Sequence, residues 1–351
     1  MCSVLYSCPA ALEMTVQTGD AIASLPADVR KLARKRSQPT WIGPMLATLV
    51  AQPFSDRGWI FEPKLDGERC LTFRSGKKPR LLSRNQKLLN DTYPELVGPL
   101  ARQGAGTYIA DGEIVAYHGD VTSFLQLQRR MQVRDPEEAR RRGVRVFYNL
   151  FDLLYLDGYD LRDVPLVHRK ALLKEAFQFS GPLRFTEHRR RDGEAFFRES
   201  CRNGLEGVIA KRADGVYVSK RSRDWLKFKC WAVQEFVLGG FTEPQGKRTG
   251  FGALLLGYYD RGKLIYAGKV GTGFDRDILT RLGSRLAKLE ITKPLFAGKV
   301  SAGHGVHWVK PKLVAQVRFS EWTADGKLRH PRFLGIRTDK DPREVVREQP
   351  Q

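Results

Sequence analysis

The stretch on which the interpretation of this chain depends is Trp59-Ile60-Phe61-Glu62-Pro63-Lys64-Leu65-Asp66-Gly67-Glu68-Arg69. Its apolar start favours a short strand, and Asp66-Gly67 favours a tight turn directly after Lys64. A lysine held at the end of a strand can act as a nucleophile when nearby cations or loss of water lower the pKa of its amine. The same residues also suit an ordinary surface hairpin that carries charged side chains. The stretch therefore predicts a strand and a turn, with Lys64 as a candidate nucleophile.

Short β-rich runs alternate with helical stretches on both sides of this turn, over residues 40–230. Residues 144–156 are an example of a β-rich run, and residues 135–142 and 168–179 have the composition of helices. This pattern predicts a mixed α+β domain.

The pattern changes after Trp231. Short alternating strands separated by glycine-containing turns follow, with one helical stretch at residues 276–289. We expect a small Greek-key barrel of the OB type over residues 231–351.

Residues 1–39 turn polar and then basic, and they lack the features of a signal peptide. We expect them to form a flexible basic arm.

The composition points to a polyanionic partner. The 351 residues include 60 Lys and Arg against 39 Asp and Glu, which gives a net charge of +21. Such a surplus favours nucleic acid ahead of an anionic membrane surface, because no basic amphipathic segment stands out. A hydrophobic content of 42% is enough for packed cores, and no apolar run reaches the roughly 18–20 residues of a membrane helix. We expect a soluble protein without a membrane partner.

The cysteines and histidines give little sign of a disulfide or a zinc site. Five cysteines without a CxxC pair argue against a disulfide framework and favour a reducing compartment. His304 and His307 form an HxxH pattern, but no carboxylate or cysteine lies at a convincing ligand spacing. We expect no metal at that pair.

Six further motifs follow Lys64. They are Ser83-Arg84-Asn85, Asp111-Gly112-Glu113, Phe151-Asp152-Leu153-Leu154-Tyr155, Leu205-Glu206-Gly207-Val208-Ile209-Ala210-Lys211, Trp225-Leu226-Lys227-Phe228-Lys229 and Arg337-Thr338-Asp339-Lys340. In the fifth, strict alternation puts Lys227 and Lys229 on one face of a strand, where they form either a solvated edge or a cradle for an anion. Each motif alone also has an ordinary explanation, such as a turn, a core phenylalanine or a basic tail.

In this order, the motifs from Lys64 to Lys340 resemble those of the covalent nucleotidyltransferases, specifically the ATP-dependent DNA ligases. The resemblance is closest to the compact bacterial ligases, such as the stand-alone ligase C and the ligase module of the end-joining ligase D. It implies an α+β protein in which a nucleotidyltransferase (adenylation) domain, residues 40–230, is followed by an OB-fold β-barrel domain, residues 231–351.

The resemblance also implies roles for individual residues. Lys64 would be the nucleophile, Phe151 would stack on the adenine ring, and Glu62, Arg69 and Arg84 would line the nucleotide site. Glu113 and Glu206 would bind the metal, for which hard oxygen donors favour Mg²⁺, with Mn²⁺ as a plausible substitute.

Basic residues would handle the phosphates of ATP. Lys227 and Lys229 would hold the α-phosphate, and we expect their charge to lower the pKa of Lys64. Arg337, Asp339 and Lys340 would orient the pyrophosphate leaving group. Since these three residues belong to the second domain, that domain must close over the nucleotide, and Cys230–Glu235 is the expected hinge.

The implied reaction has three steps. Lys64 attacks the α-phosphate of ATP to form lysyl-AMP, the AMP passes to the 5′-phosphate of a nick in duplex DNA, and the 3′-hydroxyl displaces AMP to seal the strand. We expect a monomer in the bacterial cytoplasm, with the nucleoid. Repair proteins leave no readable mark on the sequence.

Several alternatives stay open. An RNA ligase or an mRNA-capping guanylyltransferase shares the nucleophile motif and part of the site. An NAD-dependent ligase is disfavoured, because its zinc-binding cysteines and its length are missing. A noncatalytic basic OB-fold binder of nucleic acid would need none of this chemistry, and Lys64 would then be one more surface lysine. Labelling with ATP or GTP would separate these alternatives.

Overall fold

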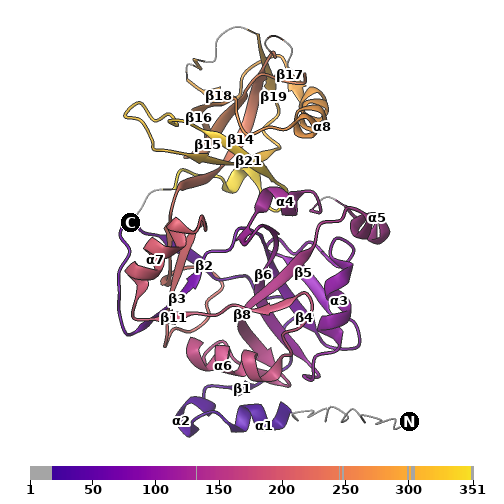
Figure 1. The fold of residues 1–351 in the computed structure, drawn as a ribbon, viewed down its shortest axis with the longest axis vertical. Helices are drawn as coiled ribbons and strands as arrows, with labels where there is room; N and C mark the ends of the chain where they lie inside the picture. Colours follow the sequence, from indigo (N-terminus) through magenta and orange to yellow (C-terminus); the bar gives the residue numbers. More distant parts are fainter. Residues whose placement is uncertain are drawn as a thin grey trace, which may run out of the picture.

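The computed structural model describes residues 18–131, 133–244, 246, 249–298, 300–301 and 305–348. None of the helices in these ranges is long and apolar enough to cross a membrane. The described residues form three sheets, two in the first domain and one in the second (Figure 1).

The first sheet is built around β8, whose residues are nearly all buried. Its strand order is β1 (Arg34–Lys35), β9 (Tyr159–Asp160), β8 (Val146–Leu156), β6 (Tyr108–His118), β4 (Glu68–Arg74) and β5 (Arg80–Ser83), with β7 (Val121–Thr122) beside β6 and β10 (Leu183–Phe185) beside β8. Two helices supply leucines to the core on this sheet, α3 (Pro94–Ala101) and α6 (Leu166–Ala176). A strand buried along its whole length reads as a continuous apolar run, which is what the sequence shows here.

The second sheet carries the Lys64 turn. Its strand order is β11 (Arg189–Arg190), β3 (Trp59–Pro63), β12 (Gly207–Arg212), β13 (Arg221–Lys229) and β2 (Leu46–Leu49). One face packs with α7 (Gly193–Arg202) through Phe61, Val208 and Phe228. On the opposite face, Trp225 packs against Phe151 of the first sheet. The alternation of side chains along each strand therefore divides this sheet into a packed outer face and an inner face next to the first sheet.

The third sheet forms the second domain, together with α8 (Arg276–Ala287). Its strand order is β17 (Glu290–Ile291), β19 (Val306–Val309), β14 (Ala232–Thr242), β15 (Leu254–Asp260), β16 (Lys263–Val270) and β18 (Phe296–Ala297), with β20 (Val314–Phe319) between β14 and β21 (Arg332–Arg337). β14 pairs with β20 along its first half and with β19 at its end. The sheet curls around this long strand, which confirms the expected α+β fold with an OB-like second domain.

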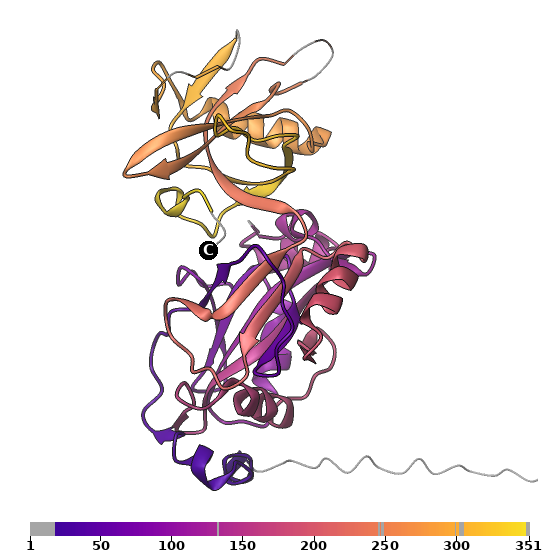
Figure 2. The ribbon, with the colours of Figure 1, turned by 90° about the vertical axis from the view of Figure 1, so that its left-hand side faces the viewer.

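The two domains meet at a narrow waist, above which the OB-like sheet stands (Figures 1 and 2). Two short helices of the first domain, α4 (Phe124–Gln128) and α5 (Pro136–Arg141), lie on the side of that domain facing the waist (Figure 1). The Gln128 side chain donates a hydrogen bond to the Ile336 carbonyl of β21 at 3.0 Å. The chain returns to the waist through a short 3-10 helix, Pro342–Glu344. Residues 342–348 therefore lie between the domains rather than at the outer end of the second one.

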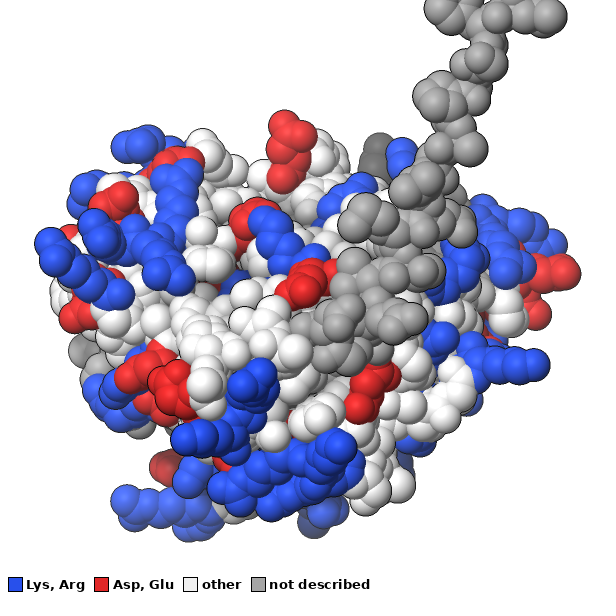
Figure 3. Space-filling view, turned by 90° about the horizontal axis from the view of Figure 1, so that it is seen from below, with Lys and Arg blue, Asp and Glu red and all other residues white. Residues whose placement is uncertain are grey.

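The structure differs from the expected arm. Residues 1–17 lie outside the described residues, but α1 (Thr18–Ala23) and α2 (Ala27–Arg30) bury Ile22, Leu25 and Val29 in the main core, and β1 pairs with β9. The basic side chains that suggested a loose segment remain exposed. The helices α1 and α2 lie at the end of the first domain away from the waist (Figure 1), and the view from that end shows many Lys and Arg side chains at the surface (Figure 3). Ile22, Leu25 and Val29 are too few, and too widely interrupted by polar and charged residues, to predict a packed segment from the sequence.

The expectation of no disulfide was wrong. Cys201 at the end of α7 is bonded to Cys230, with their Cα atoms 5.2 Å apart, and Cys70 is a buried free thiol. Cys2 and Cys8 lie outside the described residues. A count of cysteines says nothing about which of them meet in space, and here the fold brings together two that are 29 residues apart. The bond joins α7 to the segment that we expect to be the hinge.

The HxxH pattern is only partly described, because His304 lies outside the described residues. The His307 ring lies against the Phe241 ring, with centroids 4.8 Å apart, and its nitrogens face Glu290 at 2.6 Å and Glu243 at 3.5 Å. These carboxylates raise the pKa of His307. Within the described residues, no cluster of three or more His, Cys, Asp or Glu side chains could hold a metal ion.

Candidate active site

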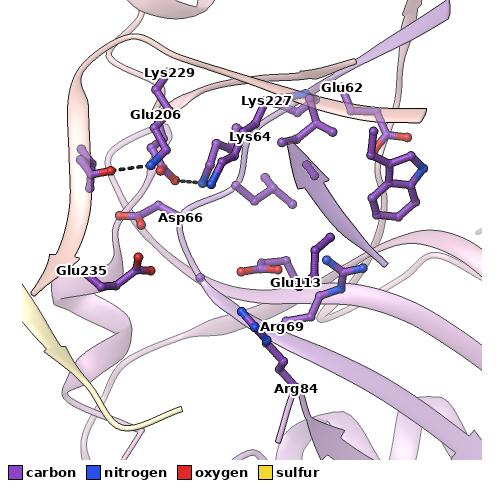
Figure 4. Close-up of a pocket in the computed structure, with 18 of the residues that line it drawn as sticks. Glu62, Lys64, Asp66, Arg69, Arg84, Glu113, Glu206, Lys227, Lys229 and Glu235 are labelled. Carbon is purple, nitrogen blue, oxygen red and sulfur yellow. Dashed lines mark hydrogen bonds and ion pairs between the residues drawn. The ribbon is translucent and has the colours of Figure 1, made fainter. Parts of the chain in front are cut away.

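A pocket at the waist brings together every residue that the sequence predicted for the site (Figure 4). From the first domain these are Glu62, Lys64, Arg69, Arg84, Glu113, Phe151, Glu206, Lys227 and Lys229, and from the second they are Arg337, Asp339 and Lys340. The alternation in the second sheet explains much of this gathering. Phe61, Val208 and Phe228 point toward α7, so that Glu62, Ile209 and Lys227, which are paired across three strands, all line the pocket.

Lys64 directly follows β3, and its amide donates to the Gly207 carbonyl at 2.9 Å. Its Nζ lies 2.5 Å from Oε2 of Glu206. Burial opposes the charge of this ammonium group, but Glu206, with Asp66 and Glu113, outweighs burial and raises the pKa of Lys64. Lys64 is therefore a charged group that is paired with Glu206.

The pKa of Lys64 is raised, so the expectation that Lys227 and Lys229 would lower it was wrong. Lys227 and Lys229 lie on one side of β13 as predicted, but their Nζ atoms are 2.8 and 2.7 Å from the carboxylate of Glu348. Burial and the charge of Lys229 lower the pKa of Lys227 to about 8. Lys64 also contributes to the lowered pKa of Lys227, so the two lysines repel one another, but the acidic neighbours of Lys64 outweigh this effect and burial at Lys64.

Buried charges surround Glu62 at the far end of the pocket from Lys229 and Glu235 (Figure 4). Lys170 of α6 lies 2.7 Å from Oε1 of Glu62, and Lys211 lies 2.6 Å from Oε2. Although burial by itself would raise the pKa of Glu62, these two lysines outweigh it and lower the pKa. Burial also lowers the pKa of Lys211 to about 8.

Phe151 lies in the same region and is almost fully buried, with 7% of its surface exposed. The Lys211 ammonium is 4.0 Å from the centre of its ring, the Arg69 guanidinium is 4.7 Å away, and Trp225 meets it edge-on. Phe151 is thus a pocket residue that also belongs to the core between the sheets.

Arg69 is held firmly by an acidic partner. Its guanidinium makes two hydrogen bonds of 2.6 Å to Asp111, which also accepts a bond from the Tyr217 hydroxyl. Bidentate pairing of this kind fixes the plane of the guanidinium as well as its position. Arg69 therefore faces the pocket from a preset orientation.

The predicted metal ligands, Glu113 and Glu206, both line the pocket beside Lys64. Burial raises the pKa of Glu113 to about 7, against the opposing effect of Arg69 and Lys64. Mg²⁺ is usually held by one or two carboxylates together with substrate phosphates and water. Two carboxylates next to Lys227 and Lys229, which could bind a phosphate, fit this pattern. Two carboxylates are too few for a metal site built from protein ligands alone.

The second domain contributes its basic motif at the waist. Arg337 pairs in bidentate fashion with Asp339 at 2.9 and 2.7 Å, and Lys340 lies 3.6 Å from Glu235. The Asn85 side chain donates to the Asp339 carbonyl at 2.7 Å, which links the two domains. Lys340 and Arg337 outweigh burial and lower the pKa of Glu235. The second domain therefore lies over the pocket.

The pocket and near-pocket residues that were not predicted for the site include Lys170, Lys211, Glu235 and Glu348. Lys211 ends a motif that was noticed, so its spacing from Glu206 was an available signal. Lys170 sits on a helix among ordinary residues, and Glu348 lies near the C-terminus, so the sequence held no sign of either. Asp66 accepts a hydrogen bond from the Phe124 amide at the start of α4, at 3.0 Å, instead of facing Lys64 alone.

A lysine at a strand end, set among carboxylates and near paired lysines and a basic motif of the second domain, is the arrangement that a covalent nucleotidyltransferase needs. Comparison with known families agrees. The family described as "ATP dependent DNA ligase domain" matches residues 44–229, and "ATP dependent DNA ligase C terminal region" matches residues 247–340. The chain belongs to the ATP-dependent DNA ligases.

Individual relatives support this assignment. The multifunctional non-homologous end joining protein LigD of Pseudomonas aeruginosa is 40% identical over 337 residues, covering 93% of this chain and 39% of that protein. The corresponding DNA repair protein of Mycobacterium tuberculosis H37Rv is 39% identical over 314 residues, covering 88% and 40%. This chain therefore spans about two fifths of the length of these relatives. A solved structure, mycobacterial DNA ligase D complexed with ATP and MES, is 37% identical, with a TM-score of 0.65 over 88% of this chain and 98% of that one.

Proposed function

We propose that this chain seals nicks between a 5′-phosphate and a 3′-hydroxyl in duplex DNA through a lysyl-AMP intermediate on Lys64. The observation that supports this most directly is the placement of Lys64 beside Lys227 and Lys229, with Arg337 and Lys340 of the second domain lining the same pocket. Cations at these positions would neutralise the charge of a bound triphosphate along its length.

In the first step the Lys64 nitrogen forms a bond to the α-phosphorus, and the bond from that phosphorus to the pyrophosphate oxygen breaks. Lys64 must give up its proton and its Glu206 partner before it can attack. Lys227 and Lys229 would hold the α-phosphate, while Arg337 and Lys340 would hold the departing pyrophosphate, with Asp339 fixing the Arg337 plane. Glu113 and Glu206 would bind Mg²⁺, or Mn²⁺, which would supply further neutralisation of phosphate charge.

Phe151, Glu62 and Arg69 would receive the adenosine part of ATP, with Arg84 at the rim. The two later steps transfer AMP to the DNA 5′-phosphate and then release it, for which the second domain, from Trp231 onward, would swing away about Cys230–Glu235. The net charge of +21 supports a DNA partner. By analogy with the LigD relatives, whose names include end joining, we propose that the chain joins broken or nicked DNA ends as a monomer in the bacterial cytoplasm.

Labelling tests this proposal directly. Incubation with α-labelled ATP and Mg²⁺, without DNA, should give an acid-labile, base-stable adduct, because a phosphoramidate nitrogen leaves readily only when protonated. Lys64→Ala should abolish the adduct, whereas Lys77→Ala, at an exposed turn, should not. Preferential labelling by GTP would favour a capping enzyme, sealing of nicked RNA alone would favour an RNA ligase, and no adduct with either nucleotide would favour a noncatalytic binder.

A further inference from the structure

The buried face of α6 carries two consecutive cations. Arg169 and Lys170 are almost completely inaccessible to solvent. Arg169 makes hydrogen bonds of 2.7 and 2.9 Å to Asp152, the residue after Phe151. Lys170 donates to Glu62 at 2.7 Å, to the Thr186 carbonyl at 2.9 Å and to the Phe151 carbonyl at 3.4 Å. The pair therefore fixes the backbone behind Phe151 and the carboxylate of Glu62 together.

We propose that Lys170 is a positioning residue that selects the nucleotide base, because it holds Glu62 as an oriented, ionised carboxylate at the wall of the base site. This inference rests on the proposed function and deepens it. Lys170 touches no part of the phosphate cradle, and it acts on substrate only through Glu62 and the backbone of Phe151.

The selection follows from hydrogen-bond chemistry. An ionised carboxylate only accepts hydrogen bonds, whereas a protonated one also donates. Adenine presents an amino donor at its 6-position, and guanine presents an oxo acceptor there. A Glu62 held ionised by Lys170 and Lys211 would attract the first base and repel the second. Loss of Lys170 removes one of the two ion-pair partners of Glu62, and with it the contact between Glu62 and α6.

The test compares Lys170→Met with Lys174→Met, one turn further along α6, where the side chain is 60% exposed and pairs with an exposed glutamate. For Lys170→Met, KM for ATP in self-adenylation should rise, and the preference for ATP over GTP should fall by about tenfold or more. Sealing of a nick that already carries 5′-AMP should keep its wild-type rate. Lys174→Met should match the wild type in all three assays. An unchanged nucleotide preference in folded Lys170→Met would overturn the proposal.

A second variant covers the case in which Lys170→Met does not fold. Removal of the only partner of a buried charge is strongly destabilising, but Glu62 keeps Lys211 at 2.6 Å when Lys170 is replaced. Lys170→Gln leaves this Glu62–Lys211 pair intact, removes only the charge of residue 170, and keeps a side chain that can donate a hydrogen bond in the buried site. This variant should fold and still have a reduced preference for ATP. A wild-type preference in it would also overturn the proposal. If the wild-type chain itself forms no adduct with any nucleotide, it is the proposed function that fails.

A different observation carries a second inference. The C-terminal tail, residues 341–348, runs along the waist between the domains and inserts Glu348 between Lys227 and Lys229. The tail is held on the second domain by the Gln234 side chain. This side chain donates a hydrogen bond to the Val346 carbonyl at 3.1 Å and accepts one from the Glu348 amide at 3.0 Å. Val345 is buried in the core of that domain. The Glu348 carboxylate thus binds both Lys227 and Lys229, the two lysines that are proposed to hold the α-phosphate.

We propose that this tail competes with ATP for the lysine pair and keeps the unloaded enzyme closed. The tail is anchored on the second domain while its carboxylate binds the first, so Glu348 bridges the domains only when they are closed. ATP must displace it, and opening of the domains withdraws it. Apparent affinity for a ligand falls in proportion to the fraction of molecules whose site is free.

Glu348→Gln tests the competition, since it keeps the size of the side chain and removes its charge. KM for ATP in self-adenylation should fall by about tenfold, with kcat unchanged, because charged hydrogen bonds to both lysines are lost. The stabilisation of the protein by ATP in thermal unfolding should increase in parallel. Glu321→Gln, an exposed glutamate of the same domain paired with Arg329, serves as the control. An unchanged or increased KM in Glu348→Gln would overturn the proposal.

Discussion

Glu68 shows how a single buried acid reports on the closed pocket. It lies on β4 with 4% of its surface exposed and accepts a hydrogen bond of 2.6 Å from the Tyr93 hydroxyl. Burial, helped by the nearby Asp339 of the second domain, raises the pKa of Glu68 from 4.5 to about 8, against the opposing effect of that hydrogen bond. Its protonation state therefore depends on the domain that covers it.

The resulting prediction concerns stability against pH. The unfolded chain releases this proton near pH 4.5, whereas the folded chain keeps it until about pH 8. The protonated side chain therefore contributes stability that is complete below the lower value and is lost as the pH rises toward the higher one. Glu68→Gln should leave Tm nearly unchanged at pH 5 and raise it relative to wild type at pH 8. The difference in the free energy of unfolding at pH 8 is at most roughly 5 kcal/mol, at about 1.4 kcal/mol per pKa unit. Calorimetry of both proteins over this range would contradict the assignment if the difference in Tm did not grow with pH.

Phe151 allows base stacking and core packing to be separated. Phe151→Leu keeps most of the apolar volume but removes the aromatic face, so we expect KM for ATP to rise while the free energy of unfolding falls by less than about 1.5 kcal/mol. Phe73→Leu is the matched control, since Phe73 belongs to the same core cluster but does not line the pocket. It should lose similar stability with unchanged ATP use. A stability loss in Phe151→Leu without any effect on KM would mean that Phe151 is only a core residue.

The local sequence pattern was sufficient to predict how some of these residues are placed. Alternation predicted that Lys227 and Lys229 share a face, because β13 is a regular strand at its end. It could not predict their partner, because Glu348 arrives from more than a hundred positions away, through a tail whose path depends on the packing of the second domain. The raised pKa of Lys64 comes from Glu206, Asp66 and Glu113, which all stand in motifs that were recognised, so the sequence lacked only their distances from Lys64.

At the scale of elements, the N-terminal helices α1 and α2 show where composition misled. Five basic residues between positions 30 and 36 suggested a loose arm, yet Leu25 and Val29 are buried against the main core. The barrel-like second domain was predicted because many short alternating strands have few other ways to close. The disulfide between α7 and Cys230 was missed, since it depends on tertiary proximity alone.

The buried helices lead to a stability prediction. Leu25→Ala should lower the free energy of unfolding by about 2–5 kcal/mol, because it leaves a cavity between α1 and α2 and the core. Leu32→Ala, at a neighbouring position with 37% of its surface exposed, should cost roughly 0.5 kcal/mol or less. Chemical unfolding of both variants measures the difference. Equal, small losses would mean that residues 18–36 are attached only loosely in solution.

At the scale of the whole molecule, polar contacts hold the two domains together at the waist. Gln316 of the second domain donates to Asp66 at 3.3 Å, the Asn85 side chain donates to the Asp339 carbonyl at 2.7 Å, and Arg84 lies 3.4 Å from Glu344. Polar interfaces between domains resemble transient rather than permanent ones. Such a waist is compatible with the proposed function, in which the domains close for the first step and open for the later ones.

This arrangement predicts that Arg337 is needed for one step only. Arg337 lines the pocket in the closed form, where the proposed function requires a cation on the pyrophosphate. Arg337→Ala should reduce self-adenylation by about 10²-fold or more, in line with the loss of a charged group that stabilises a phosphoryl transfer. Once AMP is on the DNA, no pyrophosphate is left to bind, so a nick carrying 5′-AMP should still be sealed at close to the wild-type rate.

Arg329→Ala, an exposed arginine of the same domain, controls for the loss of charge. Equal loss in both assays for Arg337→Ala would mean that Arg337 holds the closed structure or the DNA rather than the leaving group, and a Tm measured beside the two rates would tell those apart.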